Sequence, residues 1–338
     1  MTEPRSILII ANPTAGRGRG ARTATEVAER LRANGMHVRI LNSTGPGEAA
    51  RMAGKAADGT DSEINGGDAT LIAQKGDAGP RENNQRPTCI VACGGDGTVQ
   101  EIAGALAARR ETLGNRCPTL GLAPAGRCND FSRALGIDRQ PEKIVDVLTN
   151  GVARPIDLGR ANGRYFCTVA TLGADAEVSR FVDGMKMPLR GTLAYIYGAV
   201  RVLLRYRGRP VRIEGDFGSF DGRIFIATSA NTSLYGGAIR IVPGATPTDG
   251  KLDLCIIRSV SRPRAFGLLV SICRARHTTL PEVRIAGTRR IRIDSEECLE
   301  IWADGEPLTT TPATIEVVPS AIRVMLPADT LLDERSSH

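Results

Sequence analysis

The stretch TCIVACGGDGTVQEIAGAL, residues 88–106, predicts a strand, a glycine-rich turn and a helix in direct succession. Residues 88–92 form a short apolar run, and Val99, Ile102 and Leu106 recur at the spacing of one helical face. Glycines in the turn let backbone N–H groups approach a ligand closely, and the N-terminus of the helix behind them carries partial positive charge. This combination favours a phosphate-binding turn.

An aspartate, Asp96, lies inside this turn. A carboxylate and a phosphate are both anions and repel each other. Asp96 therefore needs a magnesium ion, a role in proton transfer or a structural partner. The turn by itself leaves these three possibilities open.

Two common phosphate-binding motifs do not fit the chain. The P-loop needs GxxxxGK followed by Ser or Thr, whereas the two Gly-Lys pairs, Gly54-Lys55 and Gly250-Lys251, are followed by Ala56 and Leu252. The dinucleotide-binding fingerprint needs GxGxxG after the first strand, and GRGRG at 16–20 has a different spacing. The turn that follows residue 92 is therefore the more specific phosphate signal.

The residues before this turn alternate between strand and helix patterns. Strand patterns at 7–11 and 37–43 are each followed by a helix pattern, at 21–35 and 47–57. This order predicts an α/β domain with a parallel sheet. Residues 58–86, rich in Gly, Asp and Asn, interrupt the alternation, and we expect them to form a flexible insertion because loops of this length are uncommon inside compact domains.

After about residue 155 the pattern changes to short strands bounded by Gly, Asp or Pro, which is typical of an antiparallel β domain. We therefore expect one domain at 1–155 and a second at 156–330, with a tail that is free to return to the first domain. Two helix patterns, 191–206 and 262–276, interrupt the strands. The first is interpreted as a core-packing helix, with a membrane-binding helix as the alternative.

Composition limits the partners that the protein can have. The net charge of +7 and the isoelectric point near 9.2 favour anionic partners such as nucleotides and lipid headgroups. Aromatic residues make up only 4%, which argues against a base-stacking nucleic-acid surface. The apolar run at 266–273 is too short to cross a bilayer and the N-terminus lacks the apolar core of a signal peptide, so we expect a cytoplasmic protein.

Seven blocks of the sequence carry a resemblance to a known family. They are NPTAG (12–16), CGGDGTVQEIAGAL (93–106), GLAPAGRCNDFSRALGI (121–137), PIDLG (155–159), YFCTVATLGADAEV (165–178), PGATPTDGKLDLCII (243–257) and ADGEP (303–307). In this order they resemble the diacylglycerol kinase catalytic domain superfamily, of the soluble bacterial type, which includes sphingosine and ceramide kinases and is distantly related to NAD kinases. The resemblance implies an NAD-kinase-like α/β domain that binds nucleotide, a C-terminal antiparallel β-sandwich domain that binds lipid, and an active site in the cleft between them.

The resemblance implies that ATP lies along the glycine-rich turns. The glycines would offer backbone donors, and the Thr98 hydroxyl would bond a phosphate or cap the helix. The positions expected to contact the nucleotide are Asn12, Pro13, Thr14, Ala15, Gly16, Thr44, Gly94, Gly95, Asp96, Gly97, Thr98, Val99, Gln100, Glu101, Arg127, Asn129 and Asp130.

Arg127 departs from the family pattern PxGTxND, which has threonine where this chain has arginine. Arginine is longer and cationic and can hold a phosphate through two N–H groups, so it would either clamp ATP or crowd the nucleotide. The choice of nucleotide and the catalytic rate therefore stay open.

Phosphoryl transfer needs positioning, Mg²⁺ and a group that takes the hydroxyl proton. The catalytic residues implied by the resemblance are Asp304 and Glu306, which would supply the general base, together with Asp96. Asp130 matches an acidic position near magnesium and water, although it could instead cap the helix that follows it. An Asp-Gly turn such as 304–305 is otherwise an ordinary hairpin.

The resemblance also implies a metal site in the second domain. Asp157 matches an acidic position near magnesium, and a structural Mg²⁺ would be held by the Asp249 carboxylate with the carbonyl oxygens of Thr246 and Lys251. Oxygen ligands of this kind suit a hard cation. A plain type I turn is the alternative interpretation of the same residues.

We therefore expect an ATP-dependent lipid kinase that moves the γ-phosphoryl group to a lipid hydroxyl and sits transiently on the anionic inner face of the membrane. Two alternatives stay open: a nucleotide-binding regulatory protein without catalysis, suggested by Arg127, and a relative of the NAD kinases, against which 244–254 and 303–307 argue. The sequence leaves the acceptor open among diacylglycerol, a sphingoid base, a polyprenol and a glycolipid, and it does not decide whether the chain forms a homodimer.

Overall fold

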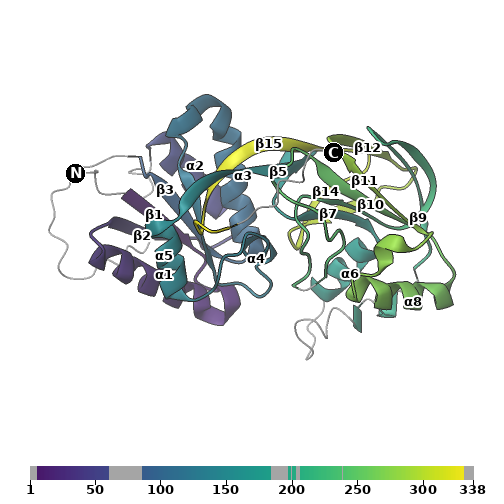
Figure 1. The fold of residues 1–338 in the computed structure, drawn as a ribbon, viewed down its shortest axis with the longest axis horizontal. Coiled ribbons are helices and arrows are strands. Elements are labelled where there is room, and N and C mark those ends of the chain that lie inside the picture. Colours follow the sequence, from purple (N-terminus) through teal and green to yellow (C-terminus); the bar gives the residue numbers. More distant parts are fainter. Residues whose placement is uncertain are drawn as a thin grey trace. The chain divides into compact units, whose positions relative to one another are not determined.

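The computed structural model describes residues 6–60, 86–183, 197–198, 200–202, 206–237 and 239–330. The described chain folds into two compact units (Figure 1). The first comprises the described residues of 6–156 together with 321–330, and the second comprises the described residues of 157–320. Most of the predicted insertion at 58–86, from 61 to 85, and most of the predicted helix at 191–206 lie outside the described residues.

The first unit is built on a parallel sheet. Its strand order is β2-β1-β3-β4-β15, and every neighbouring pair within it is parallel. The strands are β1 (Ser6–Ala11), β2 (His37–Asn42), β3 (Cys89–Gly94), β4 (Thr119–Pro124) and the end of β15 (Ala313–Leu326). Helices connect the first four strands, as the alternating strand and helix patterns predict.

Helices cover both faces of this sheet. Ile7 and Ile9 of β1 pack with Val27 and Leu31 of α1 (Ala15–Ala33) and with Ile144 of α5 (Pro141–Asn150). Residues that alternate along a strand point to opposite faces, so the buried Leu8 and Ile10 face the other side. That side carries α2 (Glu48–Asp58) and α3 (Asp96–Leu113), which pack on each other (Figure 1).

The second unit is an antiparallel β-sandwich. Strand β9 (Gly218–Ala230) joins its two sheets, because residues 218–224 pair with β8 and residues 226–230 pair with β7 and β10. One sheet continues from β9 through β7, β13 and β14 on one side and β10 and β11 on the other, and the second continues through β8, β12, β15, β5 and β6. The strand bounds are β5 (Val152–Ala161), β6 (Arg164–Phe166), β7 (Val169–Gly173), β8 (Arg209–Gly215), β10 (Leu252–Arg258), β11 (Val283–Thr288), β12 (Arg290–Asp294), β13 (Glu300–Ala303) and β14 (Glu306–Thr310).

Two helices cover the outer face of one sheet in this unit. Leu254 and Ile256 of β10 point into the sandwich, whereas Cys255 and Ile257 point outward. The outward residues belong to a second apolar cluster that includes residues of α6 (Ala174–Asp183) and α8 (Arg262–Cys273). Among the described residues no helix combines the length and the apolar character that a membrane span requires.

The boundary at the C-terminal end differs from the expected range of 156–330, although the sequence left open a return of the tail to the first domain. Residues 321–330 belong to the first unit. The reason is that β15 is longer than the strand pattern at 313–320 indicates, and Val324 near its end pairs in parallel with Leu120 of β4. Helices α5 and α6 and strands β11 and β14 were not anticipated either.

Candidate functional site

Three turns meet at the C-terminal ends of β1, β3 and β4, and we call them the glycine turns (12–18, 94–98 and 124–129). A β-carbon added to Gly126 would lie 2.4 Å from the Cα of Gly95, and one added to Gly16 would lie 2.1 Å from the carbonyl oxygen of Ala125. The backbone N–H of Ala125 donates to the carbonyl of Gly94 at 2.8 Å. The turns therefore touch backbone to backbone, and only glycine fits at positions 16 and 126.

The first glycine turn places a left-handed segment at the head of α1. The Asn12 Oδ1 accepts hydrogen bonds from the backbone N–H and the hydroxyl of Thr14, at 3.1 and 2.8 Å. Gly16, Arg17 and Gly18 then adopt positive φ angles of 57°, 65° and 84°, so the regular helix begins only after Gly18. Sequence analysis anticipated a glycine-rich turn here but not the left-handed arginine.

Asp96 joins the second and third glycine turns. Its carboxylate accepts hydrogen bonds from the backbone N–H groups of Asn129 and Phe131, at 2.8 and 3.4 Å. Burial raises the pKa of Asp96 above its ordinary value, although these N–H groups lower it. The hydrogen bonds to Asn129 and Phe131 give Asp96 a structural partner, which is one of the three roles that the sequence left open. The raised pKa means that the Asp96 carboxyl holds its proton more tightly than an exposed aspartate does.

Asn129 and Asp130 lie at the start of α4 (Asp130–Ala134) and are both buried. The Asn129 side chain closes the third glycine turn, since Oδ1 accepts from the N–H of Gly126 at 2.9 Å and Nδ2 donates to its carbonyl at 3.1 Å. Asn129 occupies the N-cap position with φ of 52°, so Asp130 is the first helical residue and not the cap. The expected alternative of Asp130 as an N-cap is therefore incorrect.

Arg127 projects from the third glycine turn and is exposed. Its carbonyl oxygen accepts a hydrogen bond from the Arg139 guanidinium at 2.7 Å. Its own guanidinium has no hydrogen bond or ion pair within the described part of the chain. The arginine that replaces the family's threonine therefore carries its charge into solvent beside the turns.

Three of the positions expected to touch nucleotide have partners inside the protein. The Glu101 carboxylate accepts from the backbone N–H groups of Gly47 and Ala50, at 2.7 and 3.3 Å, and so caps the N-terminus of α2. Thr44 donates to Glu48 through its hydroxyl at 2.8 Å. Val99 is 3% exposed, and its N–H donates to the carbonyl of Gly95, so it belongs to the core of the unit.

The other expected nucleotide positions surround the glycine turns. Thr98 is buried in the first turn of α3, with its side chain against the place where a Gly94 β-carbon would be. The remaining positions lie in the β1–α1 segment and in the first turn of α3: Pro13, Ala15, Gly97 and Gln100.

In the second unit, Asp304 is held by its neighbours in space. It lies in the turn between β13 and β14 with φ of 53° and is 8% exposed. Its carboxylate accepts hydrogen bonds from the backbone N–H groups of Cys167 and Thr168, at 2.7 and 2.9 Å, and from the Thr168 hydroxyl. Glu306, two residues later, is exposed. Asp304 is thus a fixed, buried carboxylate, and Glu306 is the solvent-facing member of the pair.

Asp157 is anchored in the same unit. Its two carboxylate oxygens accept from the backbone N–H groups of Ser320 and Gly250, at 2.7 and 2.8 Å. The Asn231 amide donates to the carbonyls of both Asp157 and Cys167, at 2.9 and 2.8 Å. Asn231 therefore connects Asp157 to Cys167, one of the two residues that hold Asp304, which sequence analysis did not anticipate.

The residues expected to hold magnesium fit a hard cation in chemistry. Burial raises the pKa of Asp157, and the nearby Asp249 carboxylate raises it further. The Asp249 Oδ1 accepts from the backbone N–H of Lys251 at 3.0 Å, in the turn that also contains Thr246. No cluster of three or more His, Cys, Asp or Glu that could hold a metal occurs among the described residues, so carbonyl oxygens would have to complete the site.

An apolar cavity of about 60 Å³ lies between the helices and the sheet of the second unit. Its wall includes Phe225 and Ile226 of β9 and Leu269 and Ile272 of α8. The wall is almost entirely apolar, as in pockets that bind hydrocarbon. The resemblance implies that this domain binds lipid, but the sequence did not identify α6 and α8 as walls of a cavity.

One polar pair interrupts the apolar wall of this cavity. Asp175 and Tyr235 both line it, and the Tyr235 hydroxyl donates a hydrogen bond to the Asp175 carboxylate. A ligand with a polar group at one point of an otherwise apolar body would match this distribution.

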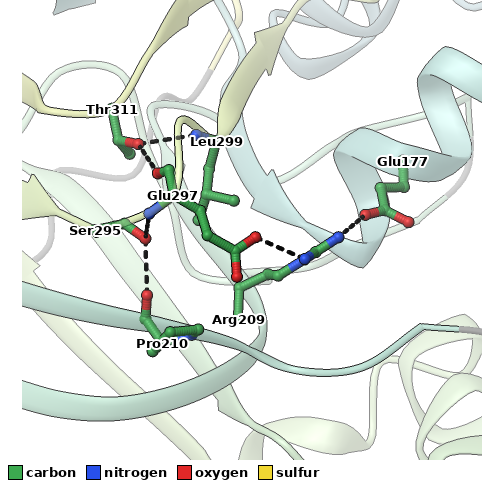
Figure 2. Close-up of polar contacts among 7 residues, drawn as sticks. All are labelled: Glu177, Arg209, Pro210, Ser295, Glu297, Leu299 and Thr311. Atoms are coloured by element: carbon green, nitrogen blue, oxygen red, sulfur yellow. Dashed lines mark hydrogen bonds and ion pairs between the residues drawn. The ribbon is translucent and has the colours of Figure 1, made fainter.

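A second hollow lies beside this cavity and shares Val202 with it. Its lining includes Arg209, whose guanidinium bonds Glu177 of α6 at 3.2 Å and Glu297 at 2.6 Å (Figure 2). The hydroxyls of Ser295 and Thr311 hold the segment that carries Glu297 (Figure 2). The two ion pairs therefore connect α6, which forms part of the cavity wall, to β8 and to the segment before β13.

Two family models match the chain. The diacylglycerol kinase catalytic domain matches residues 6–161, and the YegS C-terminal NAD kinase beta sandwich-like domain matches residues 168–326. A diacylglycerol kinase of Bacillus subtilis (strain 168) is 30% identical over 322 residues, which are 95% of this chain and 96% of that protein. A diacylglycerol kinase of Mycobacterium tuberculosis (strain ATCC 25618 / H37Rv) is 29% identical, with 95% of each chain covered.

A solved structure is also similar. The crystal structure of a diacylglycerol kinase from Bacillus anthracis str. Sterne superposes with a TM-score of 0.72 and covers 96% of this chain and 98% of its own. At 24% sequence identity this likeness bears on the fold alone. It agrees with the order of a parallel α/β unit and an antiparallel β-sandwich described above.

Proposed function

The chain belongs to the diacylglycerol kinase family, and from this premise we propose that it is an ATP-dependent lipid kinase, which transfers the γ-phosphoryl group of ATP to a lipid hydroxyl. The observation that carries the proposal is the meeting of the three glycine turns at the C-terminal ends of β1, β3 and β4. Ligands of open α/β sheets bind at this end of the strands, and glycine turns before helices are suited to phosphates.

The nucleotide lies along the glycine turns in this proposal. The N-terminus of α3, directly after Gly95, supplies partial positive charge for the phosphates. Arg127 is exposed beside the turns and supplies a full positive charge. Glu101 and Thr44 act indirectly, because they fix the start of α2.

The acceptor hydroxyl attacks the γ-phosphorus, the bond from that phosphorus to the β–γ bridging oxygen breaks, and ADP leaves with the bridging oxygen. The hydroxyl proton passes to the Asp304 carboxylate, whose orientation Cys167 and Thr168 fix. Mg²⁺, when bound, would neutralise charge on the phosphates. Asp157 and Asp249 are the carboxylates that would hold a magnesium ion in the second unit, and Asp96 orders the glycine turns.

The apolar cavity of the second unit is the proposed site for the hydrocarbon part of the acceptor. Its wall excludes charged substrates, which favours a lipid over a dinucleotide such as NAD. The Asp175–Tyr235 pair would bind a polar group of the lipid near its head. We propose that the enzyme works in the cytoplasm and rests transiently on the anionic inner face of the membrane, where such an acceptor is found.

One observation favours a second candidate function. Arg127 stands in place of the family's threonine and could crowd a nucleotide, which would make the protein a nucleotide-binding regulator without turnover. Such a protein would bind ATP and phosphorylate none of the acceptors.

The proposal is tested by incubating the full chain with γ-labelled ATP, Mg²⁺ and either dispersed diacylglycerol, sphingosine, a polyprenol or NAD. The lipid kinase transfers label to at least one of the three lipids and none to NAD. Labelled NADP would instead show an NAD kinase. ATP binding without transfer to any acceptor, together with transfer by an Arg127→Thr variant, would show that the arginine has removed catalysis.

A further inference from the structure

Helix α8 (Arg262–Cys273) lies at the surface of the second unit (Figure 1). It has two different apolar faces. Ala265, Leu268 and Ile272 are buried against the sheet. Phe266 and Val270 lie one turn apart on the other side of the helix and are 37% and 49% exposed. They are two of only five large apolar side chains that are exposed in the described part of the chain.

The charge around this exposed face has one sign. Residues 262–276 contain four arginines and no acidic residue. Arg264 is paired with Glu282 at 2.7 Å, whereas Arg262, Arg274 and Arg276 have no hydrogen-bonded or ion-paired side chain among the described residues. All three are exposed. The surface is therefore an apolar patch flanked by uncompensated positive charge.

The same helix forms part of the wall of the apolar cavity, through Leu269, Ile272 and Cys273. Cys273 is also exposed and continues the stripe of Phe266 and Val270 at the i, i+4, i+7 spacing of one helical face. The cavity wall thus reaches the exposed stripe at the C-terminal end of the helix. A surface that touches α8 on this side is adjacent to the cavity.

We propose that the exposed face of α8, made of Phe266, Val270, Arg262, Arg274 and Arg276, docks the protein on an anionic phospholipid bilayer. Interfacial helices bind in this way, with apolar side chains in the headgroup region and basic side chains on anionic headgroups. A second copy of this chain fits less well, because its own α8 arginines would repel the first. The inference deepens the proposed function, since the lipid acceptor would reach the cavity from the bilayer against which α8 rests.

The experiment measures sedimentation of the full chain with phosphatidylcholine vesicles that do or do not contain phosphatidylglycerol, in the absence of ATP and of acceptor. Two double variants test the surface, Phe266→Ser/Val270→Ser and Arg274→Gln/Arg276→Gln. We expect binding only to the vesicles that contain phosphatidylglycerol. Each double variant should lower the vesicle partition coefficient roughly tenfold, because the arginines are attracted to anionic headgroups and the apolar side chains are buried at the headgroup boundary.

Matched controls come from the first unit. Arg116→Gln/Arg154→Gln removes the same charge from exposed positions elsewhere, and Val152→Ser removes another exposed apolar side chain. Both should bind vesicles as the wild type does. Equal losses in test and control variants would show that overall charge attracts the membrane, and would overturn the role of α8. If the wild type is a dimer in solution and the Phe266→Ser/Val270→Ser variant is a monomer, a second copy covers the exposed face of α8. That result would also overturn the proposed docking of α8 on the membrane.

Failure of this inference is separable from failure of the kinase proposal. If the α8 variants lose vesicle binding and also the phosphorylation of acceptor in vesicles, but keep the phosphorylation of short-chain acceptor in solution, both stand. If vesicle binding depends on α8 while no lipid is phosphorylated, the docking surface stands without the kinase. If all variants bind vesicles equally while wild type phosphorylates lipid, the kinase stands and the docking surface is wrong.

Discussion

The glycine turns of the first unit and the acidic residues of the second unit are positioned by different means. The turns are shaped by backbone contacts so close that Gly126 and Gly16 have no room for a β-carbon. Asp157 and Asp304, in contrast, are side chains held by backbone N–H groups from distant segments. The glycine turns depend on the absence of side-chain atoms, whereas the acidic side chains depend on hydrogen bonds. Substitutions in the two units should therefore lower stability and activity for different reasons.

The largest effect is expected for Asp304→Asn. Loss of the proton acceptor should lower the rate of phosphoryl transfer by about 10³-fold, within the usual range for a general base, with ATP affinity unchanged. Transfer rate and ATP Kd would be measured on the same preparation. Thr168→Val is the control, because it removes one donor to the carboxylate and keeps the carboxylate itself. An equal loss in that variant would mean that Asp304 acts by ordering 167–168.

Gly126→Ala is expected to damage the first unit sterically. The added methyl group would lie 2.4 Å from the Cα of Gly95, so the two turns must separate, at a cost of about 3 kcal/mol in the free energy of unfolding. ATP affinity should fall with it. Gly45→Ala is the matched control, because nothing lies within 4 Å of its added β-carbon. Denaturant unfolding of both variants checks this, and equal stabilities would contradict the close contact.

Glu101→Gln separates a structural role from a nucleotide contact. The substitution removes negative charge from the N-terminus of α2, which should lower stability by about 0.5–1 kcal/mol. ATP affinity should change less than about twofold, an order-of-magnitude expectation for a residue that acts on a neighbouring helix. Calorimetric titration with ATP measures it. If the variant keeps the stability of the wild type but binds ATP much more weakly, Glu101 contacts the nucleotide directly.

The smallest effect concerns pH. Burial raises the pKa of Asp157 in the folded protein, so the folded state favours the protonated carboxyl. The stability that this contributes is present below the unfolded pKa, about 3.9, and is lost as the pH rises through the raised folded value. The Tm of Asp157→Asn relative to wild type should therefore rise between about pH 4 and neutrality, in metal-free buffer. A difference that is flat or falls with pH would contradict it.

The glycine turns could be predicted because their signal is local. Residues 88–106 contain the strand, the turn and the helix in one stretch, and the requirement for glycine follows from a backbone that must approach another backbone. The seven blocks of resemblance place the second unit in the family, and the alternation of Val211 and Ile213 with polar residues in 209–215 follows the period of a half-buried strand.

The partners of individual side chains could not be predicted, because they come from far along the chain. Glu101 bonds residues more than 50 positions earlier, and Asp304 bonds residues more than 130 positions earlier. The sequence left the return of 321–330 to the first unit open, because it depends on pairing with β4 and not on any pattern within those residues. The cavity is formed by helices α6 and α8 together with β9, so no single stretch of sequence carries its signal.

The central claim is that nucleotide binding belongs to the glycine turns and proton transfer to Asp304. The most direct measurement is the ATP Kd and the single-turnover transfer rate for wild type, Gly126→Ala and Asp304→Asn, side by side. The claim predicts weak binding in Gly126→Ala, and wild-type binding with almost no transfer in Asp304→Asn. If Asp304→Asn transfers phosphate at the wild-type rate, or if Gly126→Ala binds ATP as wild type does, the claim is contradicted.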